Sequence, residues 1–200
     1  MYRALAGGEL LAMKPLFVCT GLLLAAATLF AQTEPLPGMP PGPPKSPAAK
    51  ETATIAGKTI TIAYSSPRVR GRQGQIFTKD GLVGHEKNYP VWRAGANAAT
   101  TLETSAEIEI GDLHLPAGLY TLYVDLSDPA QWLLIVNKKT GVWGLDYDPT
   151  QNLGKVKMLL AKPPALVEEL KYTLTDTGQG QGLLTLAWEN VSASVPIRAR

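Results

Sequence analysis

The sequence predicts an all-β protein, an antiparallel β-sandwich of about eight or nine strands, with a closed β-barrel as the alternative. Three observations lead to this fold class. From Lys58 onward, apolar residues alternate with polar ones at a period of two, as in strands with one face exposed to solvent. Turn residues interrupt this alternation at short intervals. No stretch carries a long helical period.

The strand signals follow one another along the chain. Each is a set of alternating apolar side chains: Ile60, Ile62 and Tyr64; Ile108 and Ile110; Tyr120, Leu122, Val124 and Leu126; Val156 and Met158; Leu170, Tyr172 and Leu174; Leu184, Leu186 and Trp188; Val195 and Ile197. Residues 132–136 are continuously apolar, so we expect a central strand covered on both faces. Pro116-Ala117-Gly118 predicts a hairpin turn, and Pro163-Pro164 predicts the start of a helical turn.

The N-terminus predicts an export signal. Met13-Lys14 precedes an apolar run over residues 16–31, which is shorter than the roughly 20 residues of a membrane span. We expect cleavage after Ala31, a periplasmic or extracellular protein, and no stable membrane span after cleavage. An uncleaved anchor is the alternative, and residues 1–12 read as an upstream segment before Met13.

A proline-rich linker is expected between this signal and the domain. Residues 33–50 contain seven prolines in eighteen positions, too many for a helix or a sheet ladder. The predicted organisation is therefore upstream residues and signal peptide at 1–31, a disordered linker at 32–56 and the β-sandwich at 57–200.

Charge and cysteine content argue against nucleic-acid binding and against stabilisation by disulfides. The net charge of +2 argues against nucleic acid as a partner, because phosphate binding needs a concentrated basic face. The single cysteine, Cys19, lies in the export signal, so no disulfide forms within the domain and packing alone stabilises it.

An ordered set of motifs resembles one known family. The segments "YSSPRVRGR", "VWRAGANAATT", "LPAGLYTLYV", "WLLIVNK", "WGLDYD" and "AWENVSASVPI" occur in this order over residues 57–197. They resemble the bacterial domain-of-unknown-function family 2911, and the W-R-x-G-A-N-x-A-T-T core is specific to it. The resemblance implies an exported, β-rich domain without an established activity. Relative to that family the lead-in "LVGHEKNYPVWR" is longer, with His85 and Glu86 added.

Residues 91–101 hold the first candidate ligand contacts, Arg93 and Asn97. A guanidinium beside an amide can clamp a carboxylate or a sugar. The alternative, which we rank first, is a structural corner in which Arg93 caps loop carbonyls and Asn97 closes the turn in a left-handed conformation.

Two further groups are candidates for ligand binding. Arg72 forms a row with Arg68 and Arg70, which predicts either an anion contact or a solvated edge strand. Lys138, Trp143 and Tyr147 surround a second tight loop, a composition common to sugar-binding surfaces and to sandwich loops.

No catalytic, metal or cofactor site is predicted. The chain has two histidines, no metalloprotease motif and no nucleophile elbow. The stretch "DYDPTQN" starts like a calcium loop, but Gln151 and Lys157 stand at the positions of its glycine and bidentate acid, so it reads as an Asp-Pro turn. We expect a module that binds a small molecule, a glycan or an envelope protein. A hydrolase with a carboxylate pair hidden from the sequence is the alternative.

Overall fold

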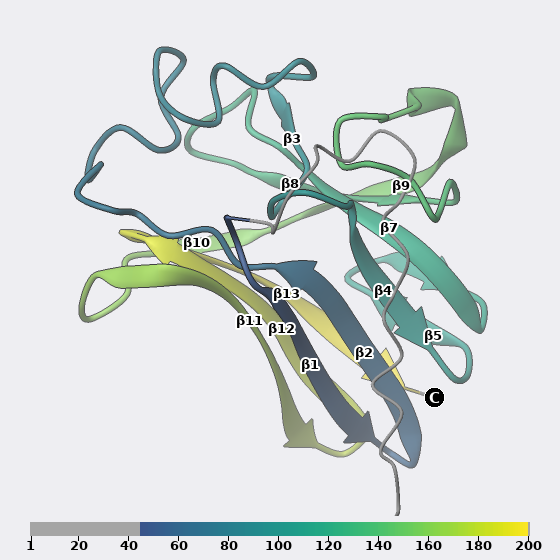
Figure 1. The fold of residues 1–200 in the computed structure, drawn as a ribbon. Helices are drawn as coiled ribbons and strands as arrows, with labels where there is room; N and C mark the ends of the chain where they lie inside the picture. The colour runs from purple at the N-terminus through teal and green to yellow at the C-terminus, as the bar shows by residue number, and fades with distance from the viewer. Residues whose placement is uncertain (1–44, 200) are drawn as a thin grey trace, which may run out of the picture. The chain divides into compact units, whose positions relative to one another are not determined.

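The computed structural model describes residues 45–199, and these residues form two antiparallel sheets (Figure 1). The expected signal peptide and most of the proline-rich linker lie outside the described residues. Within residues 45–199 no helix is long and apolar enough to cross a membrane.

The first sheet has seven strands in the order β1-β2-β4-β7-β8-β9, and β3 pairs with β7 beyond this path. Its strands are β1 (Ala48–Ile55), β2 (Lys58–Ser65), β3 (Val91–Trp92), β4 (Thr100–Thr104), β7 (Gly118–Asp125), β8 (Leu133–Asn137) and β9 (Asn152–Lys157). As expected, β8 is central: it pairs with β7 and β9, and Leu134, Ile135 and Val136 are all buried.

The second sheet has six strands in the order β11-β12-β13-β5-β6, and β10 pairs with β13. Its strands are β5 (Ile108–Ile110), β6 (Leu113–Leu115), β10 (Leu159–Ala161), β11 (Val167–Gly178), β12 (Gln181–Glu189) and β13 (Val191–Ala199). A short 3₁₀ helix, η1 (Pro149–Gln151), precedes β9.

The apolar faces of the two sheets form one core, which makes the fold a β-sandwich. Ile60 and Leu122 of the first sheet belong to the same buried cluster as Leu186 and Ile197 of the second. In Figure 1 the long strands β11, β12 and β13 run beside β1 and β2. Each sheet ends in strands paired on one side only, β1 and β9 in the first and β11 and β6 in the second, so the alternative of a closed barrel is not realised in the described chain.

Three local expectations are wrong. Residues 48–55, assigned to the linker, form β1, because every residue from Ala48 to Ile55 pairs with β2. The strand count is thirteen in the described chain rather than eight or nine, because several strands have only two or three residues. The residues after Pro163 bend without helical hydrogen bonding and enter β11.

The Pro116-Ala117-Gly118 turn does not close a hairpin, because it joins strands of different sheets. The preceding β6 belongs to the second sheet and the following β7 to the first. The hydroxyl of Tyr120 donates back to the carbonyl of Pro116 at 2.9 Å. This contact resembles the tyrosine corners that fix sheet-to-sheet crossings in other sandwiches.

The long loop between β2 and β3, residues 66–90, is anchored by its own buried side chains. Ile76 and Val83 are fully or almost fully buried, and their backbones are hydrogen-bonded to each other. Phe77 inserts its ring among Trp92, Trp132 and Trp188, with centroid distances of 4.9 to 5.7 Å. This aromatic packing fixes the loop over one end of the sandwich.

Candidate functional site

Residues 93–99, here called the corner, form a loop between two segments that both pair with β7. Trp92 in β3 pairs with Val124 of β7, and Thr100 in β4 pairs with Leu122 of the same strand. The chain therefore leaves the edge of β7 after Trp92 and returns to it at Thr100. The seven residues between are displaced from the sheet.

The base of the corner is held by buried hydrogen bonds. The carbonyl of Ala94 accepts from the hydroxyl of Tyr172 at 2.8 Å and from that of Thr100 at 3.1 Å. Ala94 and Asn97 both adopt left-handed backbone conformations, with φ of 52° and 58°. The left-handed conformation expected of Asn97 is thus confirmed, although its side-chain amide donates outside the corner, to the carbonyl of Ser46 at 3.2 Å.

Two glycines allow the corner to pack closely. A Cβ at Gly95 would lie 2.7 Å from the hydroxyl oxygen of Thr100. A Cβ at Gly144 would lie 2.5 Å from Cδ of Arg93 and 2.9 Å from the carbonyl oxygen of Asn97. The small residues at these positions are therefore required by packing between protein segments.

Arg93 does not cap loop carbonyls, which corrects the expected structural role. Its Nε donates to Oε1 of Glu86 at 2.9 Å, and the two side chains are only 18% and 12% exposed. Burial raises the pKa of Glu86 above its usual range, although Arg93 beside it acts in the opposite direction. Glu86, in the loop that precedes β3, thus supplies the partner of the corner arginine.

The three arginines at 68, 70 and 72 are not a row on one face of a strand. Arg68 lies opposite Glu169 at the edge of β11 and forms an ion pair with it. Arg70 then takes a left-handed conformation, with φ of 51°. Arg72 folds back, donating from Nε to the carbonyl of Val69 at 2.9 Å and from Nη2 to that of Arg68 at 2.7 Å.

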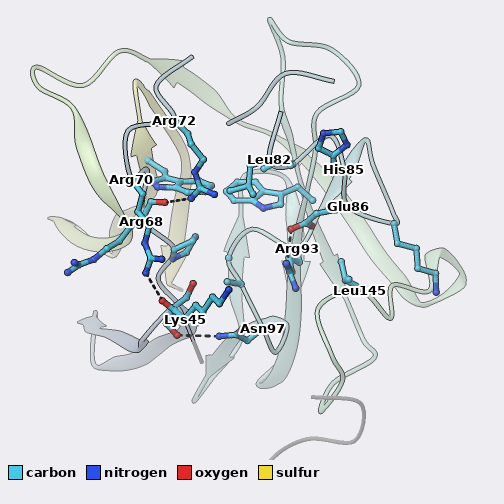
Figure 2. A pocket seen from close by; sticks show the side chains of 18 residues that line it. Lys45, Arg68, Arg70, Arg72, Leu82, His85, Glu86, Arg93, Asn97 and Leu145 are labelled. Atoms are coloured by element: carbon cyan, nitrogen blue, oxygen red, sulfur yellow. Dashed lines mark hydrogen bonds and ion pairs between the residues drawn. The ribbon is translucent and has the colours of Figure 1, made fainter. Parts of the chain in front are cut away.

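The loop that carries Arg68, Arg70 and Arg72 faces the corner across a cavity of about 590 Å³, here called the basic pocket (Figure 2). Trp92 from the first sheet and Trp188 from the second line it, and their rings stack at 5.9 Å. The carbonyl of Lys45 accepts from Arg70, as that of Ser46 does from Asn97, so the segment before β1 ties both walls together.

Cations dominate the lining of the basic pocket. Within the described chain one acid, Glu86, lines it together with six Lys or Arg side chains: Lys45, Arg68, Arg70, Arg72, Lys87 and Arg93. Figure 2 shows Arg72 on one side of the pocket and the Arg93–Glu86 pair on the other. Among residues 45–199, Nη1 of Arg72 and both terminal nitrogens of Arg93 have no hydrogen-bond partner.

The other three candidates do not join this pocket. Lys138 is exposed, and its backbone N–H donates to Gln151. Trp143 forms an isolated β-bridge with Ala98. Tyr147 packs its ring against Tyr123 at 4.7 Å. The second loop therefore supports the corner and the outer face of the sheet, and neither Trp143 nor Tyr147 lines the pocket that contains Arg93.

The Asp-Pro segment is a turn, as expected. The carboxylate of Asp148 accepts from the backbone N–H of Thr150 at 3.0 Å and from its hydroxyl at 2.7 Å, and it caps η1. Residues 45–199 contain no group of three or more His, Cys, Asp or Glu side chains placed to hold a metal ion. Of the two histidines, His85 lines the basic pocket, and His114 lies 3.3 Å from Glu107 on the surface.

Three of the candidate residues, Arg72, Arg93 and Asn97, line the basic pocket, but several other lining residues were not candidates. Trp188 was assigned to a strand face and Lys45 to the linker, and neither position carries a local signal of binding. Glu86 had one usable signal, its place in the segment "LVGHEKNYPVWR", where the family resemblance implies added residues.

Comparison with known proteins identifies a family. A family model described as "Protein of unknown function (DUF2911)" matches residues 46–197. The searches of curated proteins and of solved structures returned no significant match.

Proposed function

The chain belongs to the DUF2911 family, as its WRxGANxATT motif predicts, and we propose that it is an exported β-sandwich that binds a small organic anion in the basic pocket. The observation that carries this proposal is the convergence of six cationic side chains and one acid on a single cavity. The net charge of the whole chain is only +2, so this excess is local.

The arginines of the pocket are suited to recognising an anion. Arg72 is held by two loop carbonyls and Arg93 by Glu86, and each keeps a terminal nitrogen for another partner. A guanidinium already held in place loses little conformational entropy when it binds a carboxylate. The cavity of about 590 Å³ is within the range of small-molecule sites.

The alternative of a hydrolase lacks support in this pocket. Two-carboxylate hydrolysis requires a pair of acids flanking the scissile bond, about 5–9.5 Å apart. Glu86 is the one acid lining the basic pocket within the described residues, and its Oε1 is already bonded to Arg93.

Calorimetric titration of the purified protein with galacturonate and succinate tests the proposal. We expect binding that weakens as salt is added and that Arg72→Ala reduces at least about tenfold, the loss of one charge-assisted contact. Lys87→Glu reverses the charge of an exposed lining residue without disturbing the core, so it keeps the test valid if Arg72→Ala unfolds.

Arg198→Ala is the matched control. Arg198 is 56% exposed and pairs with Glu109 on the second sheet, outside the basic pocket. Its removal should leave binding unchanged. Absence of binding by both anions, or equal losses in the pocket and control variants, would contradict the proposal.

A further inference from the structure

Two buried polar atoms beside the basic pocket have no hydrogen-bond partner within residues 45–199. They are Oε2 of Glu86 and Nε1 of Trp188, and both residues line the cavity. Buried polar groups in folded proteins almost always have a partner, so each exception needs an explanation. One of these atoms is a donor. The other is an acceptor whenever Glu86 is ionised.

The fold itself supplies no partner for either atom. The indole of Trp188, a residue only 2% exposed, packs against the rings of Trp92 and Phe77, and its Nε1 has no hydrogen-bond partner among residues 45–199. Glu86 uses Oε1 for Arg93, while Oε2 remains unpaired. The raised pKa of this carboxyl group is consistent with an environment that solvates its charge poorly.

A simple anion would provide a hydrogen-bond partner for only one of these two atoms. Sulfate and simple carboxylates offer acceptors, which suit Trp188 and the arginines, but they bring no donor for an ionised Glu86. A hydroxyl group both donates and accepts, so it can serve either atom. The same cavity is also lined by the apolar side chains of Leu82, Val83 and Leu145, which suit the C–H face of a ring.

We infer that the basic pocket takes a polyhydroxylated carboxylic acid of sugar size, with its carboxylate against the arginines and its hydroxyls paired with Glu86 Oε2 and Trp188 Nε1. This inference rests on the proposed anion-binding function and specifies the chemistry of the ligand. The shared chemistry is that of a uronic acid, either free or as a unit of an acidic glycan.

A matched set of ligands tests the inference by calorimetry on the purified protein. Galacturonate carries both the charge and the hydroxyls, cyclohexanecarboxylate keeps the charge and a six-membered ring without hydroxyls, and galactose keeps hydroxyls without the charge. We expect galacturonate to bind at least about tenfold more tightly than either of the other two, the equivalent of one or two satisfied hydrogen bonds. Trigalacturonate distinguishes the sources: tighter binding than galacturonate indicates a glycan, and equal binding indicates a free sugar acid.

Trp188→Phe should remove most of the preference for galacturonate over cyclohexanecarboxylate, because phenylalanine keeps an aromatic ring but lacks the indole N–H donor. Since Trp188 is buried, this variant can fail to fold, and the indole N–H resonance of Trp188 in the unmodified protein provides a second readout. That resonance should shift with galacturonate and stay in place with cyclohexanecarboxylate.

The outcomes separate the two proposals. Equal affinities for galacturonate and cyclohexanecarboxylate, or an indole resonance that galacturonate leaves unmoved, would overturn the requirement for hydroxyls and leave anion binding intact. If neither acid binds, the proposed function fails and this inference fails with it.

Discussion

Arg93 and Glu86 form an ion pair, Nε to Oε1 at 2.9 Å, that joins the corner to the end of the long loop before β3. Both side chains are more than four-fifths buried, so neither is a solvated surface charge. The pair positions Arg93 at the wall of the basic pocket while leaving its terminal nitrogens without partners in the described chain. The corner is thus a structural element that also presents a cation to the pocket.

The effect of replacing Glu86 on stability should depend on whether Arg93 is present. Arg93→Ala leaves the Glu86 carboxylate buried without its cation, and we expect a loss of about 1–3 kcal/mol in the free energy of unfolding. Glu86→Gln should destabilise the unmodified protein but stabilise the Arg93→Ala variant, because there it removes an unpaired buried charge.

Urea unfolding of the four proteins of this double-mutant cycle measures both effects. Arg198→Ala serves as the exposed control, with an expected change of about 0–1 kcal/mol. If Glu86→Gln had the same effect with and without Arg93, the ion pair would contribute no coupling.

The carbonyl of Ala94 should show non-additive hydrogen bonding, because it accepts from both Tyr172 and Thr100. Tyr172→Phe and Thr100→Val each leave one donor in place, so each should cost about 0.5–1.5 kcal/mol. The double variant leaves a buried carbonyl without a partner, and its cost should exceed the sum of the two single costs. Thermal and urea unfolding check this, and additive costs would mean that another donor replaces the lost ones.

The sequence predicted the sandwich because strands of this fold bury every second side chain. This alternation can be read within each strand, without knowledge of its partners. It located the central strand β8 for the same reason, whereas the left-handed Asn97 was predicted from the turn preference of asparagine. It missed β1, whose residues "AAKETATI" contain one large apolar side chain at an otherwise partly exposed edge. Edge strands need few apolar residues, so their pattern is weak.

The basic pocket was only partly predictable because its parts are far apart along the chain. Arg72, Arg93 and Trp188 come from a loop, a corner and the end of β12, and only the pairing of the strands brings them together. Trp143 and Tyr147 had the composition of a binding loop, yet they are engaged in a β-bridge and a ring contact with their neighbours. Composition alone does not distinguish these two uses of an aromatic residue.

Asn97 should tolerate glycine better than alanine. Its φ of 58° is a left-handed conformation that costs alanine roughly 1 kcal/mol but costs glycine nothing. Both substitutions remove the hydrogen bond to Ser46, so the difference between them isolates the backbone contribution. We expect Asn97→Ala to lower the free energy of unfolding by about 1 kcal/mol, less than Arg93→Ala, and Asn97→Gly to lower it by less. Equal losses would assign the role of Asn97 to its side chain alone.

Anion binding should strengthen as the pH falls through the pKa of Glu86. Burial raises that pKa above the usual value of 4.5, so the change is expected above pH 4.5. Below the pKa the carboxyl group is neutral, which removes a negative charge from the pocket lining and releases Arg93 from its ion pair. By linkage, a bound anion must in turn raise the pKa of Glu86.

Titrations with cyclohexanecarboxylate between pH 5 and 8 test this sign, because that ligand stays ionised over most of the range and carries no hydroxyl to pair with Glu86. Histidine side chains in general change charge in this pH range, and His85 lines the pocket, so the measurement uses proteins that carry His85→Gln. In that background Glu86→Gln should bind the anion with an affinity that no longer varies with pH and that matches the low-pH affinity of the parent. A pH dependence that persists in Glu86→Gln would assign the effect to another group, since the amide cannot titrate and leaves the six cations of the pocket unchanged.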